Sequence, residues 1–281
     1  MKNIALITNA IKDVGLDVTK AAIDILSSEG MSVYVANDLG SHFSDVITYS
    51  SFPDNIDLII VVGGDGSVID ASKYAVKYDI PLLGINLGKV GYLAEVENDN
   101  LSVLKQLKDG SYTISDKMLL EIELINKGAV VSELAVNDIV ASHDEQLLIA
   151  DFKIEDSVGN VIKYRADGII FATPQGSTAY SLSAGGPILA HDVESILMTP
   201  VSPHSFFNRS VLFNSGECIR VTNISEYPLA VRVDGRMRGS LNKNEICTVR
   251  KSARTIKMLT FSKNSMFSSL FRKMRIIGDM D

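Results

Sequence analysis

A single carboxylate stands among three glycines in the segment Gly63-Gly64-Asp65-Gly66-Ser67. Glycines let backbone N–H groups approach a ligand without obstruction by a Cβ atom, and the N-terminus of a following helix attracts anions. The segment therefore predicts a phosphate-binding loop. An aspartate in such a loop repels phosphate unless a metal ion bridges the two or the carboxylate holds the proton of a hydroxyl group, and both arrangements belong to phosphoryl transfer. We take Asp65 as the candidate base, and a plain turn in which Asp65 caps the helix as the alternative.

This loop belongs to neither of the two common phosphate-binding classes. A Walker A loop has four residues between its first glycine and Gly-Lys-Ser/Thr, whereas the segment 84–90 has three, and Val90 follows the lysine. A dinucleotide fingerprint that starts at Gly64 needs a third glycine at the position of Ile69.

A second segment, residues 165–188, is rich in hydroxyl groups and small residues. Its polar side chains are those of Arg165, Asp167, Ser177, Thr178, Tyr180, Ser181 and Ser183. Hydroxyls at this density suit the ribose and amide groups of a ligand, and a tyrosine can stack on a ring. The alternative is an ordinary surface loop rich in serine and glycine. The apolar run IIFAT that precedes the hydroxyls indicates a loop that leaves a buried strand.

The first hundred residues alternate between strand-like and helix-like segments. Strands are expected at 3–8, 32–37, 58–62 and 81–86, and helices at 17–30, 67–78 and 101–110. The unbroken apolar run LIIVV is typical of a strand covered on both faces. This alternation predicts an α/β domain over residues 1–111, with a parallel sheet and helices on both sides.

After about residue 112 the pattern changes to short, often alternating strand-like segments separated by Gly, Asn and Asp turns. An antiparallel all-β domain is expected over residues 112–258, and no Pro/Gly tract marks the boundary. The tail is helical again at 263–275, with apolar residues on one side. We expect that face to dock on a domain, and binding to a membrane surface is the alternative.

The composition excludes several classes of protein. Hydrophobic residues make up 46% of the chain and charged residues 22%, as in ordinary globular proteins. The net charge of −7 argues against a nucleic-acid-binding protein. No apolar run approaches the ~20 residues that span a bilayer, and the first residues show no cleavable signal. Cys218 and Cys247 form no disulfide framework, and the four histidines show no zinc-type spacing. We expect a cytoplasmic protein with neither a membrane nor a nucleic-acid partner.

Four blocks of the chain resemble the NAD kinase family, in the family's order. They are GGDGS (63–67), LGINLGKVGYLAEV (83–96), AVNDIV (135–140) and ATPQGSTAYSLSAGGPI (172–188). PHSFFNR (203–209), VDGR (233–236) and the FSSLFRK tail are weaker matches. The fourth block, in company with the first, is highly specific.

The resemblance implies an enzyme that phosphorylates the 2′-hydroxyl of the adenosine ribose of NAD to give NADP. The donor is ATP or, in some members, inorganic polyphosphate. It also implies an N-terminal α/β domain, a C-terminal β domain, a tail (259–281) that packs back on the first domain, a divalent metal such as Mg²⁺, and a homodimer or homotetramer.

The family's functional positions can be carried over residue by residue. Asp65 matches the proton acceptor, and Gly63, Gly64, Gly66 and Ser67 form the phosphate-binding loop. The positions that match dinucleotide-binding residues are Asp65, Gly66, Tyr92, Asn137, Asp138, Arg165, Asp167, Thr178, Ala179, Tyr180, Ser181, Ser183 and Arg236.

Several of these positions depart from the family's pattern. Ser67 replaces a threonine and keeps the hydroxyl, Gln175 replaces a threonine, and Arg236 replaces a glutamine. Asp138 replaces a glutamate, so its carboxylate is one methylene shorter and its ribose contact is expected to be lost or water-mediated.

Two other functions remain open from the sequence. Diacylglycerol and sphingosine kinases also carry Gly-Gly-Asp-Gly and a β-rich second domain, but they lack a block like ATPQGSTAYSLSAGG. A non-catalytic sensor that binds NAD or NADP is the alternative from another class, and the intact Asp65 loop gives it little support.

Overall fold

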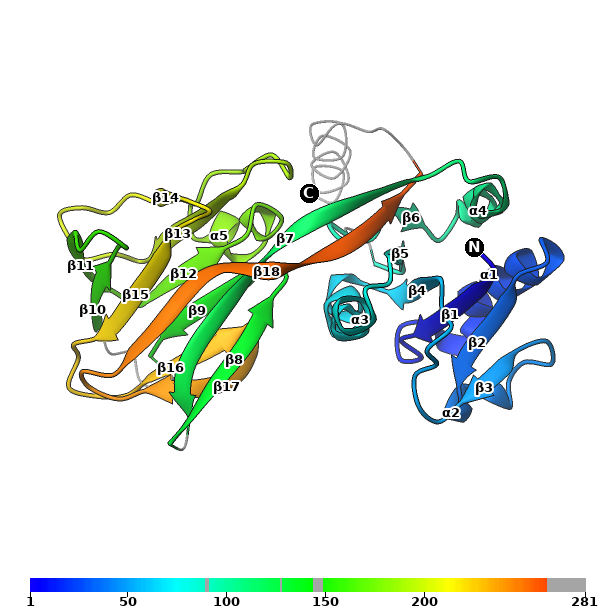
Figure 1. Cartoon of the computed structure of the whole chain (residues 1–281), viewed down its shortest axis with the longest axis horizontal. Helices are drawn as coiled ribbons and strands as arrows, with labels where there is room; N and C mark the ends of the chain where they lie inside the picture. The colour runs from blue at the N-terminus through cyan, green and yellow to red at the C-terminus, as the bar shows by residue number, and fades with distance from the viewer. Residues whose placement is uncertain (89–90, 127, 144–148, 262–281) are drawn as a thin grey trace. The chain divides into compact units, whose positions relative to one another are not determined.

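The structure is a computed structural model that describes residues 1–88, 91–126, 128–143 and 149–261. The chain divides into two compact units, one of Met1–Asp116 with Ile256–Asp281 and one of Lys117–Thr255 (Figure 1). Both divisions fall inside long strands, β7 (Thr113–Asn126) and β18 (Ile246–Thr260), which explains why no change of composition marks a linker. The helical tail expected at 263–275 lies outside the described residues.

The first unit contains the expected parallel sheet. Its strands lie in the order β3-β2-β1-β4-β5, and neighbouring strands are parallel throughout. Their bounds are β1 Asn3–Thr8, β2 Ser32–Ala36, β3 Ile47–Tyr49, β4 Leu58–Gly63 and β5 Leu82–Asn86, and β6 (Val96–Glu97) pairs with β5. Every residue of β4 is buried, so the run LIIVV is covered on both faces as expected.

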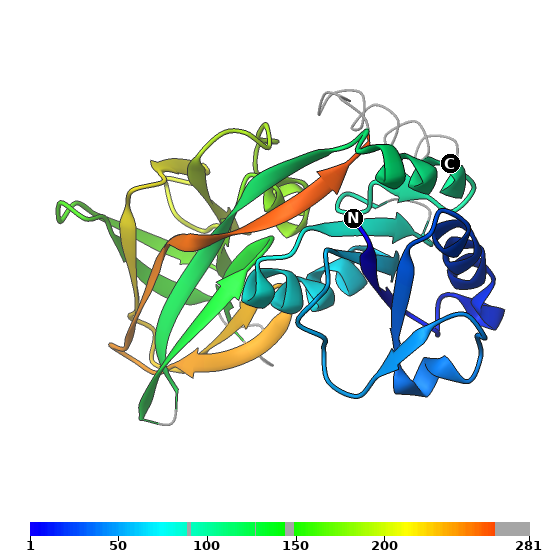
Figure 2. The same cartoon turned by 45° about the vertical axis from the view of Figure 1, so that its right-hand side comes forward.

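The helices of this unit connect its strands (Figure 2). Helix α1 (Asp17–Ser28) joins β1 to β2 and packs against β2, and α3 (Asp65–Tyr78) joins β4 to β5 and packs against both. A short helix α2 (Asn37–Gly40) follows β2. The helix expected at 101–110 is instead a 3₁₀ turn at Leu101–Lys105 followed by α4 (Gln106–Asp109).

An aromatic cluster holds α3 near its C-terminal end. Phe52 stacks on Tyr74 with ring centroids 4.7 Å apart, and on Tyr78 with centroids 5.1 Å apart. Such stacked rings stabilise a contact beyond the apolar area that they bury. The helix whose first turn contains Asp65 is therefore fixed by packing well away from that turn.

The second unit is built of antiparallel strands, as expected. Six of them form one sheet in the order β14-β13-β12-β9-β16-β17. The other strands follow the order β11-β10-β15-β18, in which each strand pairs with the next. Strand β18 also pairs with β7, and β7 pairs with β8. The bounds are β8 Ala129–Ala135, β9 Asp138–Ser142, β10 Ala150–Glu155, β11 Val161–Ala166, β12 Gly168–Ala172, β13 Ser195–Val201, β14 Val211–Asn214, β15 Cys218–Asn223, β16 Leu229–Val233 and β17 Arg236–Leu241.

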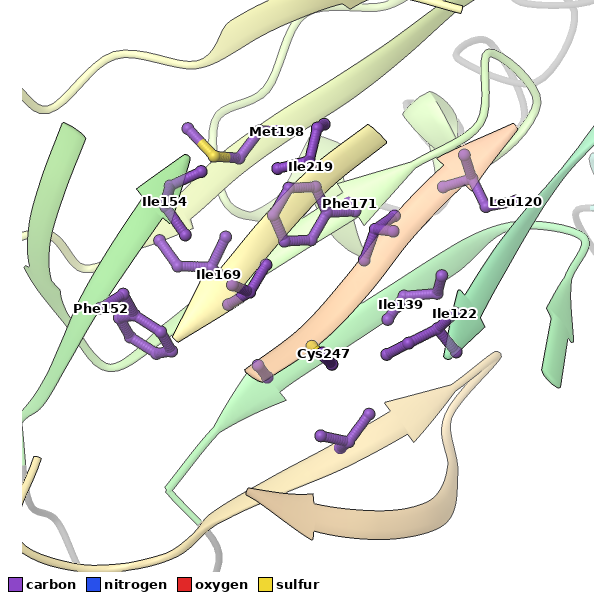
Figure 3. Packing of buried hydrophobic residues seen from close by; sticks show 14 of the residues in the cluster. Leu120, Ile122, Ile139, Phe152, Ile154, Ile169, Phe171, Met198, Ile219 and Cys247 are labelled. Carbon is purple, nitrogen blue, oxygen red and sulfur yellow. The ribbon is translucent and has the colours of Figure 1, made fainter. Parts of the chain in front are cut away.

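The core of this unit lies between its sheets (Figure 3). Phe171 and Met198 come from neighbouring strands of the six-stranded sheet, and Phe152, Ile219 and Cys247 come from the other strands. All five side chains are almost completely buried. Cys247 is thus a small core residue, and burial raises the pKa of its thiol to about 12.

Two features of the second unit differ from the sequence pattern. Strand β13 is buried along nearly its whole length and contains Pro200, so it shows no alternation of apolar and polar residues. A short helix, α5 (Tyr180–Ser183), interrupts the strands inside the hydroxyl-rich segment.

Candidate active site

The glycine loop lies at the carboxyl edge of the parallel sheet. Strand β4 ends at Gly63, and Asp65 opens α3 as an acidic residue in its first turn. The half-buried carboxylate of Asp65 does not cap its own helix: it accepts hydrogen bonds from the backbone N–H of Tyr92 (2.8 Å to Oδ2) and of Leu93 (3.0 Å to Oδ1). A carboxylate offers about four lone-pair positions, so two donors orient Asp65 and leave room for another proton donor. The simple capping turn is therefore not what the loop forms.

Two glycines of the loop, Gly63 and Gly66, lack a side chain for different structural reasons. A Cβ atom on Gly63 would lie 2.4 Å from Oγ of Ser67, so the turn itself requires glycine there. A Cβ atom on Gly66 would meet nothing within 4 Å. Because nothing in the described protein fills that space, the absence of a side chain at Gly66 leaves the backbone open to a ligand.

The loop after β5 presents the donors that hold Asp65. The buried side chain of Asn86 organises this loop: its Nδ2 donates to the carbonyl of Gly88 (3.0 Å) and to Glu97 (2.9 Å), and its Oδ1 accepts from the N–H of Gly88 (3.0 Å). A Cβ atom on Gly91 would lie 3.0 Å from the Asn86 amide, so the chain passes close to it. The matched block 83–96 therefore supplies the backbone N–H groups that orient the carboxylate of Asp65 in the first block.

In the second unit, one carboxylate fixes the segment that holds Asn137 and Asp138. Asp234 accepts hydrogen bonds from the N–H groups of Val136 (2.9 Å), Asn137 (2.7 Å) and Asp138 (3.1 Å). Asp234 and Gly235 both have positive φ values, 47° and 77°, as a type I′ hairpin turn requires between β16 and β17. This turn directs the Asp234 carboxylate back onto the start of β9.

Burial and charge alter the titration of Asp138. Burial is the largest cause, the nearby carboxylate of Asp234 adds to it, and together they raise the pKa of Asp138 to about 7, against a hydrogen bond from the backbone of Tyr180. That contact places two of the predicted dinucleotide-binding residues, Asp138 and Tyr180, side by side. Burial raises the pKa of Asp234 as well, while the backbone donors at 136–138 lower it.

The hydroxyl-rich loop packs against the same segment by its backbone. A Cβ atom on Gly176 would lie only 2.0 Å from the carbonyl oxygen of Asn137, so no other residue fits there. Thr173 completes the contact, since its Oγ1 donates to the carbonyl of Val136 (2.7 Å) and accepts from the N–H of Gly176 (2.9 Å).

The hydroxyls of this loop divide into internal and outward groups. Ser177 and Ser181 are fully buried; Ser177 donates to the carbonyl of Pro174 (2.6 Å), and Ser181 shares a hydrogen bond with Thr199 (2.8 Å). Tyr180 and Ser183 are exposed, Ala179 is half-buried, and Thr178 is buried with its hydroxyl donated to Gln175 (3.1 Å). The outward surface is thus smaller than the composition of the segment indicates.

Arg165 and Asp167 do not join this cluster within one chain. Asp138 pairs with Ala172 at one end of β12, whereas Asp167 precedes Gly168 at the other end, about 15 Å away at ~3.4 Å per residue. Arg165 is exposed, and its backbone N–H donates to Ser205 (2.6 Å). Arg236 opens β17 opposite Val233, next to the turn that contains Asp234.

Sequence reasoning missed three residues that build these sites. Asp234 lies in the weaker match VDGR (233–236), and its Asp-Gly pair is a signal for a hairpin turn that could have drawn attention to it. Asn86 stands in the matched block 83–96, without a signal for its buried role. Lys12 lies in the loop after β1, with its Nζ 2.8 Å from the position of a Cβ atom on Gly64.

The fold and the loop define a two-unit protein whose α/β sheet carries a phosphate-type loop and whose β unit carries a hydroxyl-rich, ligand-type loop. Models of the ATP-NAD kinase N-terminal and C-terminal domains match residues 4–112 and 136–261. An NAD kinase of Natranaerobius thermophilus is 33% identical over 98% of this chain and 98% of its own length. An NAD kinase of Lachnoclostridium phytofermentans is 32% identical over 97% of this chain and 99% of its own. The chain belongs to the NAD kinase family.

Solved structures share the fold. A yeast NADH kinase complexed with NADH has a TM-score of 0.85 at 23% identity, covering 96% of this chain and 86% of its own. An NAD kinase from Archaeoglobus fulgidus in complex with ATP has a TM-score of 0.74 at 24% identity, covering 98% and 99%. Within the described residues, no helix is both long enough and apolar enough to cross a membrane.

Proposed function

We propose that this chain phosphorylates the 2′-hydroxyl of the adenosine ribose of NAD to give NADP, with Asp65 as the proton acceptor. Membership of the family supports the reaction, and one structural observation supports the role of Asp65 as the base. The carboxylate of Asp65 is oriented by the N–H groups of Tyr92 and Leu93 beside an open glycine backbone, at the carboxyl edge of a parallel sheet.

The 2′-oxygen of the ribose forms a bond to the terminal phosphorus of the donor, and the bond from that phosphorus to its bridging oxygen breaks. The leaving ADP, or the shortened polyphosphate, takes the electron pair. The hydroxyl proton passes to the carboxylate of Asp65, which the backbone donors at 92 and 93 hold in one orientation.

The residues at the start of β9 and in the 173–183 loop are proposed to bind NAD. Asn137 and Asp138 bind the ribose and adenine region, Asp138 through its short carboxylate, which is in part protonated near neutral pH and can then donate a hydrogen bond. Tyr180 is exposed and available to stack. Thr178, Ala179, Ser181, Ser183, Arg165, Asp167, Arg236 and Tyr92 remain proposed dinucleotide contacts on the family match alone.

A divalent cation, Mg²⁺, is proposed to accompany the donor. Mg²⁺ usually keeps several waters and binds through one or two carboxylates together with substrate phosphates. The described residues contain no group of three or more His, Cys, Asp or Glu that could hold a metal ion. The cation would supply charge neutralisation on the phosphates.

ATP is the proposed donor, and polyphosphate is the alternative that the glycine loop also fits, because both present a terminal phosphoryl group. We further propose a homodimer or homotetramer and a cytoplasmic location, as the family resemblance favours.

The decisive experiment supplies purified protein with NAD, Mg²⁺ and either ATP or polyphosphate, and measures NADP with an NADP-specific dehydrogenase. We expect NADP from the wild type, and a fall of ~10²–10⁴-fold in kcat for Asp65→Asn with NAD still bound. Tight NAD binding without turnover would favour the sensor, and a phosphorylated lipid would favour the lipid kinase. Full turnover by Asp65→Asn would refute the role of the base.

A further inference from the structure

The parallel sheet has a switch point beside the glycine loop. From β1 the chain passes through α1 to β2 on one side, and from β4 it passes through α3 to β5 on the other side. Since β1 and β4 are adjacent and parallel, with Thr8 opposite Val62, their carboxyl ends open one crevice. Ligands of open α/β sheets bind at such a crevice, where the connections diverge. The loop after β1 is therefore the second wall of the site that the glycine loop forms.

The two loops are tied together by hydrogen bonds. The backbone N–H of Asn9 donates to the carbonyl of Val62 (2.9 Å), and its side-chain Nδ2 donates to Oγ of Ser67 (3.1 Å). The carbonyl and the side-chain Oδ1 of Asn9 both accept from the N–H of Lys12, at 3.0 Å and 3.2 Å. Asn9 therefore fixes the backbone of Lys12 relative to the glycine loop.

The far side of the same loop is also fixed. Asp13 is buried, and its carboxylate accepts from the N–H groups of Val18 (3.2 Å) and Thr19 (2.9 Å) and from the Thr19 hydroxyl (2.5 Å). These bonds fasten the loop to the first turns of α1. Ile11 and Val14, by contrast, are 90% and 80% exposed, so the loop is held by polar bonds and not by burying its apolar side chains.

Lys12 is directed at the glycine loop from this position. Its Nζ lies 2.8 Å from the place where a Cβ atom on Gly64 would stand, so its ammonium group lies close to Gly64 on the side that a side chain would occupy. No ion pair between described residues uses Lys12. A lysine ammonium is a point charge with three donors, and phosphate oxygens are natural partners for it.

We propose that Lys12 is a catalytic residue that binds the terminal phosphates of the donor at the Gly64 backbone. This inference rests on the proposed function and assigns the donor side of the same site. The loop needs a cation because Asp65 and the net charge of −7 both repel a polyphosphate chain. Asp65 takes the proton of the attacking hydroxyl, and Lys12 stabilises the charge that develops on the transferred phosphoryl group and the leaving phosphate.

The test compares Lys12→Met, Lys12→Arg and the control Lys2→Met. Lys2 is exposed and precedes the same strand, roughly 20 Å away at ~3.3 Å per residue, so its substitution removes equal charge from the opposite edge. We expect Lys12→Met to lower kcat/KM for the donor about 10²-fold, with ATP and with polyphosphate alike. Lys12→Arg should keep most of the activity, Lys2→Met all of it, and the Kd of NAD should not change in any variant.

Two binding measurements separate the phosphate contact from other causes. Inorganic tripolyphosphate should compete with ATP on the wild type and lose most of that inhibition on Lys12→Met, whereas inhibition by adenosine should be equal on both. An unchanged kcat/KM for the donor in Lys12→Met, or an equal weakening of adenosine, would overturn the inference. A wild type that makes no NADP would instead refute the proposed function, and in that case Mg–ATP binding by calorimetry to wild type and Lys12→Met still tests Lys12.

Discussion

Replacing Asp234 by Asn should weaken the segment 136–138 and, through it, NAD binding. The carboxylate accepts three backbone N–H bonds, two on Oδ1 and one on Oδ2. Asparagine is nearly the same shape but has only one oxygen, so the amide NH₂ must face a backbone N–H that then has no acceptor. The same change removes the negative charge that strengthens the remaining bonds.

The magnitude follows from these contacts. An unsatisfied buried N–H costs about 1–3 kcal/mol, and the two remaining bonds fall from charged to neutral, each losing roughly 1 kcal/mol. Relief of the repulsion with Asp138, and of the burial of Asp234 itself, offsets part of this loss. We expect a net fall of about 2–4 kcal/mol in the free energy of unfolding of the transition that includes this unit.

The assay is urea unfolding followed by circular dichroism, together with steady-state kinetics. The KM for NAD should rise about 10-fold, corresponding to ~1.4 kcal/mol, while the KM for the donor stays the same. Asp156→Asn is the matched control, because Asp156 also accepts backbone N–H bonds, from Val158 (3.1 Å) and Asn160 (2.8 Å), but in an exposed turn. It should change neither quantity. An Asp234→Asn variant with wild-type stability and wild-type KM for NAD would refute this reasoning.

Three further predictions test single features. Gly176→Ala places a Cβ atom 2.0 Å from the Asn137 carbonyl and should cost at least ~1–3 kcal/mol of stability, seen as a lower Tm. Gly66→Ala meets nothing within 4 Å, so Tm should hold or rise while kcat/KM for the donor falls; an unchanged kcat/KM would show that no ligand uses this space. The folded-state pKa of Asp138, about 7, lies above its ordinary value, so its contribution to stability is complete below about pH 4 and is lost as pH rises to 7. Asp138→Asn should flatten that part of the stability–pH curve, and an unaltered slope would show that Asp138 does not titrate there.

The sequence predicted the fold where local pattern decides it. The buried strand β4 and the helix after it follow from LIIVV and the spacing in 65–78, and the antiparallel second unit follows from its alternation. It did not predict β13, because the sequence SILMTPV neither alternates nor forms an unbroken apolar run, and Pro200 argues against a strand. It also did not predict the 3₁₀ turn at Leu101–Lys105, whose apolar spacing is that of a helix.

The candidate site was predictable in residue types but not in contacts. The glycine loop can be recognised from its composition, whereas the hydrogen-bond partners of Asp65 at residues 92 and 93 follow from tertiary structure alone. Asp234 is distant from Asn137 in the chain and meets it only because β16 pairs with β9. The buried hydroxyl of Ser181 shows the converse, since its place in a polar segment indicated a ligand contact and its hydroxyl bonds to Thr199 instead.

The aromatic cluster on α3 makes the chain convenient for optical measurements. The chain contains no tryptophan, so Phe52→Trp would introduce the sole indole fluorophore, stacked on Tyr74 and Tyr78. The emission of that indole would report whether the far end of α3 shifts when nucleotide is added, with no label near Asp65 and no other tryptophan emission to subtract.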